Sequence, residues 1–149
     1  MSRKGEYEMR LLVHMCCGPC AVYPVDVLKK EGIEFCGYFY NPNIHPIDEF
    51  NRRMENVKIF SDKGGVKVYY SYEFLQNVWE GYEEKEKRCK MCYTLRLDRT
   101  ARFAKDNNFT AFTTTLLVSP YQNHEFIKEL GESLAQKYGI EFFYQDFRI

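Results

Sequence analysis

Five of the six cysteines in this 149-residue sequence fall into two short groups that could bind a metal together. The first group, in MCCGPC, is Cys16, Cys17 and Cys20, and the second, in KRCKMCY, is Cys89 and Cys92. Iron–sulfur clusters are held by thiolates, typically four, and ligands divided between a tight turn and a distant C-x-x-C pair are a common way to supply them. We therefore expect the fold to bring the two groups together around iron.

The second group lies in a basic segment, which favours the thiolate form that metals bind. Positive charge and the N-terminus of a helix both stabilise a thiolate. The same charges would offset the negative charge of a ligated cluster. The basic residues next to this group are Lys85, Lys87, Arg88 and Lys90.

Two other uses of these thiols remain open. A structural zinc ion would take four of them in a closed tetrahedral site, and Cys17 with Cys20 before a helix could form a redox dithiol. Neither accounts well for five cysteines. Adjacent Cys16 and Cys17 point in different directions from an extended chain, so we do not expect them to bind one tetrahedral ion together; they could hold a cluster and a neighbouring metal, or a substrate. The sixth, Cys36, lies in an aromatic strand and is expected to be an inert core thiol.

Length and charge limit the class of protein. A chain of this size is usually one domain and can bury a core without disulfides, so residues 1–149 are expected to form a single domain. The 21 basic and 21 acidic residues cancel, which argues against a general nucleic-acid binder and allows nucleic-acid contact only at a local patch. No apolar run reaches the roughly 20 residues of a membrane span and no secretory signal is recognisable, so we expect a cytoplasmic protein without a membrane partner.

The elements that position the cysteines alternate between strands and helices. Continuous apolar runs predict strands at residues 9–15, 33–40, 66–71, 109–115 and 140–144. Apolar residues at helical spacing predict helices at residues 21–30, 47–60, 73–82, 89–106 and 125–138. This alternation implies right-handed crossovers and a three-layer α/β fold with a mostly parallel sheet. Pro24 is expected to delay or bend the first helix.

Loops after the strands carry the other residues that could do chemistry. In a parallel sheet the working crevice lies at the carboxyl edge of the strands, so the cysteine turn, the NPNIHP loop and the TTTLLVSPY loop should meet there. His14, at the end of the first strand, is either a hydrogen-bonded core imidazole or a ligand. Tyr93, directly after the C-x-x-C pair, either donates a proton or only packs.

Segments spread along the chain resemble one enzyme family. HMCCGPCA, YFYNPNIHPIDEFNRR, RCKMCYTLRL, FTTTLLVSPYQNH and YQDFR, in this order between Leu11 and Arg148, are similar to motifs of the QueH family of epoxyqueuosine reductases. The resemblance implies reduction of epoxyqueuosine in tRNA to queuosine, the last step in making this anticodon base, without cobalamin. It also implies a 4Fe–4S cluster beside a separately bound iron, on a Rossmann-like nucleotide-binding (HUP-like) fold. Many members continue past the DFR motif into a helix and a cysteine-containing tail, whereas this sequence ends at Ile149.

The resemblance and the spacing together suggest roles for single residues. The cluster would take Cys17, Cys20, Cys89 and Cys92, which leaves Cys16, with His14, for the lone iron. Removing an epoxide oxygen takes two electrons and protons, and a Lewis-acid metal can activate that oxygen. The catalytic candidates are Cys16, His14 and Tyr93, and the electron donor is unknown.

Residues in the same loops are candidates for substrate contact. A flipped anticodon base needs aromatic stacking and unpaired-strand contacts, although each candidate has a plainer role in a turn, at a strand end or in a surface ion pair. The candidates are Asn41, Asn43, Arg52, Thr115, Ser119 and Tyr121. Residues 85–90 with Arg96, Arg99 and Arg102 could form a tRNA patch, with a solvated helix face as the alternative.

Two further functions would use the same residues. A zinc-stabilised α/β module would bind RNA without chemistry. An ATP-using tRNA sulfur-transferase relative could share the fold and carry a cluster, and it predicts a Ser-Gly-Gly type loop after the first strand. The corresponding turn here is CCGPC, whose single Gly is poorly suited to wrapping phosphates.

Overall fold

The structure is a computed structural model that describes five stretches of the chain, residues 10–16, 18–41, 47–71, 85–118 and 123–145. For residues 18–19 and 85–92 the description covers the backbone only. The helix predicted at residues 73–82 lies outside the described stretches.

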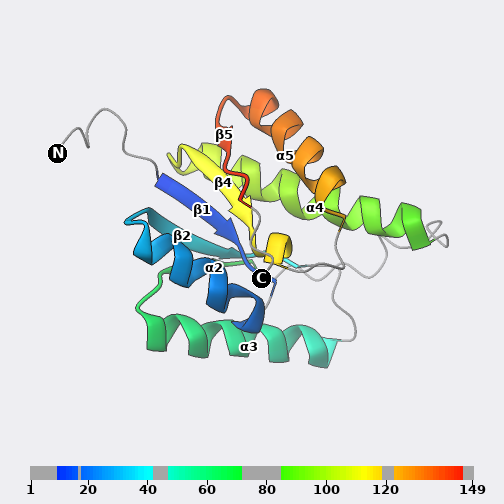
Figure 1. Ribbon diagram of the computed structural model, residues 1–149. Helices are drawn as coiled ribbons and strands as arrows, with labels where there is room; N and C mark the ends of the chain where they lie inside the picture. Colours follow the sequence, from blue (N-terminus) through cyan, green and yellow to red (C-terminus); the bar gives the residue numbers. More distant parts are fainter. Residues whose placement is uncertain (1–9, 17, 42–46, 72–84, 119–122, 146–149) are drawn as a thin grey trace.

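Within the described residues, five parallel strands form one sheet in the order β3-β2-β1-β4-β5 (Figure 1). They are β1 (Arg10–His14), β2 (Glu34–Phe39), β3 (Val68–Tyr70), β4 (Ala111–Thr114) and β5 (Glu141–Phe142). The central strand β1 buries Leu11, Leu12 and Val13 completely, as expected for a parallel strand covered on both faces. Each predicted strand is present, and each is shorter than predicted.

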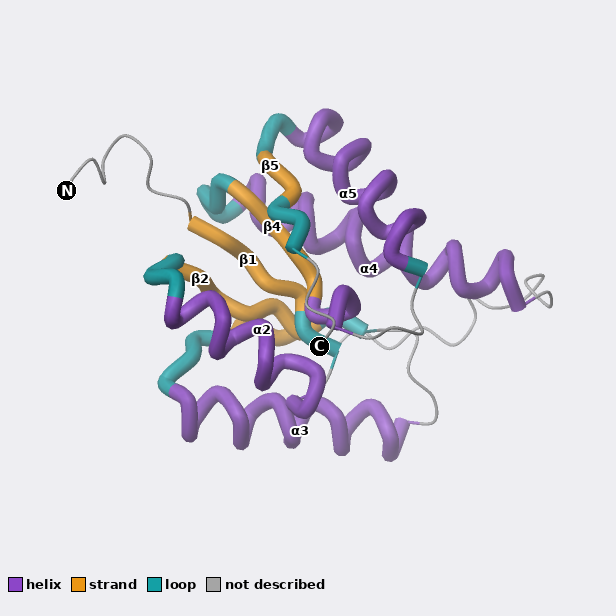
Figure 2. The backbone as a smooth tube through the Cα atoms, viewed as in Figure 1, coloured by secondary structure: helices purple, strands orange, loops and turns teal. Residues whose placement is uncertain are grey.

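Helices cover both faces of the sheet, which confirms the three-layer α/β prediction (Figure 2). One face carries α2 (Gly18–Lys30) and α3 (Ile47–Gly64), and the other carries α4 (Lys85–Asp106) and α5 (His124–Tyr138). A 3-10 helix, η2 (Thr115–Val118), follows β4 in part of the predicted loop. The bounds of α5 follow from its caps, since the Asn123 side chain accepts a hydrogen bond from Phe126 N–H and Gly139 adopts φ 70°.

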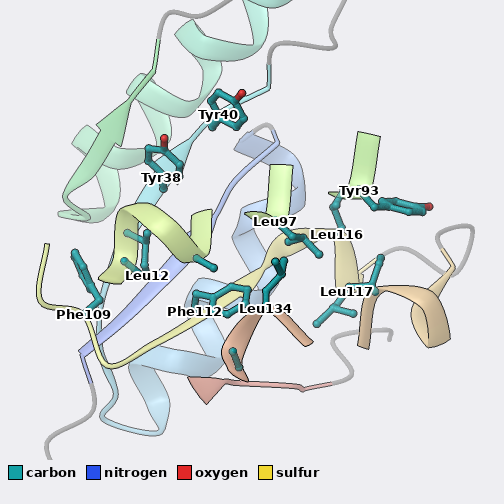
Figure 3. Packing of buried hydrophobic residues seen from close by; sticks show 14 of the residues in the cluster. Leu12, Tyr38, Tyr40, Tyr93, Leu97, Phe109, Phe112, Leu116, Leu117 and Leu134 are labelled. Atoms are coloured by element: carbon teal, nitrogen blue, oxygen red, sulfur yellow. The ribbon is translucent and has the colours of Figure 1, made fainter. Parts of the chain in front are cut away.

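Each helical layer buries its own cluster of side chains against the sheet. Under α2 and α3 the cluster is aliphatic with two phenylalanines, comprising Leu11, Val13, Met15, Ala21, Val25, Leu28, Phe39, Phe50, Met54, Val57, Val66 and Ala111. Under α4 and α5 it includes three tyrosines and a thiol as well, and its buried members are Leu12, Cys16, Tyr38, Tyr40, Tyr93, Leu97, Ala101, Ala104, Phe109, Phe112, Leu116, Leu117, Ile127, Leu134 and Ala135 (Figure 3). The two faces of one sheet are therefore chemically different.

Two predicted helix starts are wrong. The helix predicted from residue 89 begins at Lys85, because the charged residues before it are good helix formers. The helix predicted from residue 21 begins at Gly18 and includes Pro24. An internal proline removes its own N–H from the helix, and burial of Val25 and Leu28 against the sheet offsets that loss.

None of the helices in the described stretches has the length and apolar character that crossing a bilayer requires.

Candidate active site

The carboxyl edge of the sheet is centred on β1 and β4, which lie side by side while the chain leaves them toward opposite edges. Such a switch in strand order opens a crevice at the strand ends. Cys16, two residues after β1, lies beside Thr115, the residue after β4: the Cys16 N–H is 3.4 Å from Thr115 Oγ1, and Cys16 Sγ is 3.8 Å from the same oxygen. The start of the cysteine turn and the TTTLLV segment are therefore in contact.

A buried hydrogen-bond network around His14 joins the ends of three strands. His14 Nδ1 lies 2.9 Å from Thr114 Oγ1, and Nε2 lies 3.1 Å from both the Tyr40 carbonyl and Asn41 Oδ1. Since two acceptors face Nε2, this nitrogen carries the proton and Nδ1 accepts from the Thr114 hydroxyl. Asn41 completes the network by donating from Nδ2 to the Met15 carbonyl at 2.9 Å. The residue before Cys16 is thus fixed through its backbone.

His14 is held in its neutral form. It is fully buried, and this burial lowers its pKa from 6.5 to about 3, with a further lowering by the positive charge of Arg96. The hydrogen bonds to Tyr40 and Asn41 act in the opposite direction. Both ring nitrogens are engaged, so the hydrogen-bonded core imidazole of the two sequence-based alternatives describes His14 in this structure.

Helix α4 approaches the same edge of the sheet from outside. Its C-terminus connects to β4 through a short turn, so α4 runs opposite to the strands and its N-terminus lies at their carboxyl ends. At about 1.5 Å per residue its 22 residues span roughly 33 Å, against roughly 16 Å for the five residues of β1. Its first turns therefore extend past the sheet (Figure 1). Cys89 and Cys92 lie in the second of these turns.

Two polar side chains of α4 near this end, Arg96 and Tyr93, are buried. Arg96, one turn after Cys92, is 9% exposed and close enough to His14 to affect its pKa. Tyr93 is 6% exposed, its hydroxyl accepts a hydrogen bond from Asn123 N–H at 3.3 Å, and its ring packs against Phe126 with centroids 5.8 Å apart. These contacts anchor α4 against the start of α5.

The structure places the remaining predicted residues in different surroundings. Cys20 is partly buried in the first turn of α2. Asn41 is fully buried and orders the turn after β2. Arg52 is exposed on α3 and forms an ion pair with Glu49, as in the surface-pair alternative. The candidates outside the described residues are Cys17, Asn43, Ser119 and Tyr121.

Sequence reasoning missed Thr114 and the contribution of Arg96 to this site. The sequence offers three adjacent threonines as partners for His14. Only the parallel register between β1 and β4, which aligns His14 with Thr114, shows which of them it is. Cys36, predicted to be a core thiol, is only partly buried, and burial raises the pKa of its thiol. A signal for Arg96 is its helical spacing from Cys92, which puts both on one stripe of α4.

Comparison with known proteins shows which family the chain belongs to. A family model described as "Epoxyqueuosine reductase QueH" matches residues 11–149. The chain belongs to the QueH family. Proteins named epoxyqueuosine reductase QueH are 33% identical in Dehalococcoides mccartyi (93% of this chain, 78% of that protein) and 33% identical in Thermotoga maritima (93% and 74%). The QueH of Histophilus somni is 35% identical over 87% of this chain and 56% of its own length. Some QueH relatives are thus much longer than this chain.

Proposed function

We propose that this QueH-family chain is an epoxyqueuosine reductase that acts on tRNA. The family match over residues 11–149 supports the assignment. The structural observation that carries it is the position of Cys16, buried at the carboxyl edge of β1 beside Thr115, with Cys20 one helical turn later. In the reaction the epoxide oxygen leaves as water and a carbon–carbon double bond remains, which consumes two electrons and two protons. The electrons come from a donor that is not identified.

The set of thiols suits iron. No three His, Cys, Asp or Glu side chains converge among the described residues, where three of the five candidate thiols have no described side chain. The fit therefore rests on the chemistry of the donors, which are soft thiols beside a basic helix. We assign Cys17, Cys20, Cys89 and Cys92 to a 4Fe–4S cluster and Cys16 to an additional iron. Bound there, these groups would supply single electrons and a Lewis acid for the epoxide oxygen.

The chain's own residues then position and protonate the substrate. His14 is a positioning residue in this proposal, because its nitrogens hold Thr114 and the Asn41 turn in place next to Cys16. The proposed proton donor to the departing oxygen is Tyr93, whose hydroxyl also accepts a hydrogen bond from Asn123 N–H. The proposed substrate contacts are Asn41, Asn43, Arg52, Thr115, Ser119 and Tyr121.

The test is an anaerobic preparation in which iron, zinc and sulfide are counted and turnover of epoxyqueuosine in tRNA is measured. We expect brown protein that contains iron and sulfide and forms queuosine when a reductant is supplied. Colourless, zinc-loaded protein that binds tRNA without forming queuosine would contradict the proposal and favour a zinc-stabilised RNA-binding module.

A further inference from the structure

Helix α4 concentrates positive charge in a chain that is neutral overall. Eight of its 22 residues are Lys or Arg and three are Asp or Glu, whereas the whole chain has 21 of each kind. The rest of the chain is therefore net acidic. A polyanion that meets this molecule is attracted to α4 and repelled elsewhere.

A groove lies along α4 where it passes β2, and we call it the α4 groove. It is a cavity of about 400 Å³ lined by Tyr38, Arg99, Arg102, Phe103, Asp106 and Asn107. Arg102 is exposed and has no ion-pair partner among the described residues. The one carboxylate in the lining, Asp106, is at the end of α4 farthest from the cysteines.

A row of aromatic rings follows the groove. Tyr38 stacks on Tyr40 at 6.0 Å and on Phe103 at 4.4 Å between centroids, and Phe103 contacts Tyr69 at 5.3 Å. Figure 3 shows Tyr38, on β2, beside Tyr40, just after β2, away from Leu116, Leu117 and Leu134. Cations lie over two of these rings, Arg99 over Tyr40 at 5.1 Å and Lys67 over Tyr69 at 5.0 Å. Tyr38 and Tyr40 are buried, so these two rings support cations at the surface and do not themselves stack with bases.

Arg99, in the lining of the groove, contacts a residue of the candidate active site. Tyr40, under Arg99, supplies the carbonyl that lies next to His14. Arg99 follows Cys92 by seven residues, two turns along the same stripe of α4, or about 10 Å along the helix axis. This span equals about three steps of a stacked strand at roughly 3.4 Å per step. A nucleotide at the cysteines would thus have its neighbours in the groove.

We propose that the α4 groove binds the RNA strand that flanks the modified nucleotide, with phosphates at Arg99, Arg102 and Lys67. The proposal rests on the proposed function, because it takes the substrate to be tRNA. Contacts in the α4 groove would make the enzyme prefer a modified nucleotide within an RNA chain over the free nucleoside.

The test measures binding separately from turnover. Fluorescence anisotropy with a labelled, unmodified RNA hairpin of the substrate's anticodon arm reports affinity in the full chain at several salt concentrations. The variant Arg102→Glu is compared with Lys63→Glu, an exposed residue on α3 across the sheet that undergoes the same charge change. We expect Arg102→Glu to weaken binding about tenfold and to lower the slope of log K against log salt by about 1 or more. Lys63→Glu should leave both nearly unchanged.

The outcomes separate this proposal from the proposed function. Equal effects of Arg102→Glu and Lys63→Glu, or displacement of the hairpin by poly-glutamate at equal charge concentration, would overturn the groove assignment even if queuosine is formed. Conversely, binding that is sensitive to Arg102→Glu in a protein that forms no queuosine would support the groove and contradict the reductase. If Arg102→Glu fails to fold, Arg102→Gln removes the same phosphate contact and should lower the slope by about 1.

Discussion

The two faces of the sheet bury different kinds of side chain. The cluster under α2 and α3 has no side-chain N–H or O–H group among its buried members. The cluster under α4 and α5 includes three tyrosines and Cys16, and the buried Arg96 and Thr100 lie on α4 as well. Burying a polar group costs free energy unless the group is hydrogen-bonded or paired, whereas burying hydrocarbon needs no such partner to be favourable. The α2–α3 face thus contributes mainly stability, and the α4–α5 face accepts a cost in stability for its chemistry.

The largest effect is expected for the thiols of α4. Cys92→Ser should remove iron and sulfide and lower turnover by more than the roughly 10–100-fold that substitutions around a metal site cost. Cys36→Ser, on β2 and outside the proposed ligand set, is the matched control and should keep both. The readout is iron and sulfide per chain with turnover of epoxyqueuosine in tRNA. Full iron and sulfide with normal turnover in Cys92→Ser would refute the cluster assignment.

A matched pair of core leucines tests whether the two faces differ in function. Leu28 on α2 and Leu97 on α4 are both fully buried, so each change to Ala should lower the free energy of unfolding by about 2–5 kcal/mol. Only Leu97→Ala should also lower turnover at a temperature where both variants are folded, because α4 carries Cys92 and Arg96. Urea unfolding and turnover check the two effects. Equal losses of turnover in Leu28→Ala and Leu97→Ala would contradict the proposal that only the α4–α5 face contributes to activity.

His14 makes stability depend on pH. The unfolded chain binds a proton at His14 below pH 6.5, whereas the folded chain does so only near its pKa of about 3. The unfolded state therefore binds more protons between these values, so the free energy of unfolding should fall as the pH drops from 6.5 and stay level above it. Urea unfolding at pH 7.5 and pH 5 measures this decrease. The decrease should be smaller in His14→Gln, and an identical decrease would assign it to other groups.

The smallest effect is expected at Arg52, the one proposed substrate contact on α3. Its ion pair with Glu49 is exposed, so Arg52→Gln should change the free energy of unfolding by less than about 0.5 kcal/mol. Loss of a single phosphate contact should raise the KM for tRNA roughly two- to threefold. Arg53→Gln, which removes the other arginine bonded to Glu49, is the control. Equal KM values in Arg52→Gln and Arg53→Gln would contradict a specific tRNA contact at Arg52.

The order and type of the described elements could be predicted from the sequence because apolar runs and helical spacing report burial directly. The ends of the helices could not. Lys85 extends α4 because charged residues before Cys89 have no apolar pattern, although they favour a helix. Gly18 begins α2 because Gly and Pro suit the first positions of a helix as well as a turn.

The site could be predicted in its thiols but not in its hydrogen bonds. Cysteines have few roles besides metal binding in such a pattern, so their types and spacing indicate the chemistry. The link from His14 to Thr114 depends on the register between β1 and β4, which are 100 residues apart in sequence. A shift of one residue would have presented Thr113 or Thr115 instead. Thr113 Oγ1 is in fact buried with no hydrogen-bond partner among the described residues.

The uneven charge of α4 gives an electrically neutral molecule a positive end. A molecule of this kind has a dipole moment, and it turns in the field of an approaching polyanion before the two surfaces touch. The protein would then approach tRNA with α4 facing it, so a larger fraction of collisions would occur in an orientation that allows binding. The rate of association should consequently fall as ionic strength rises, although the chain as a whole has no net charge for the salt to screen.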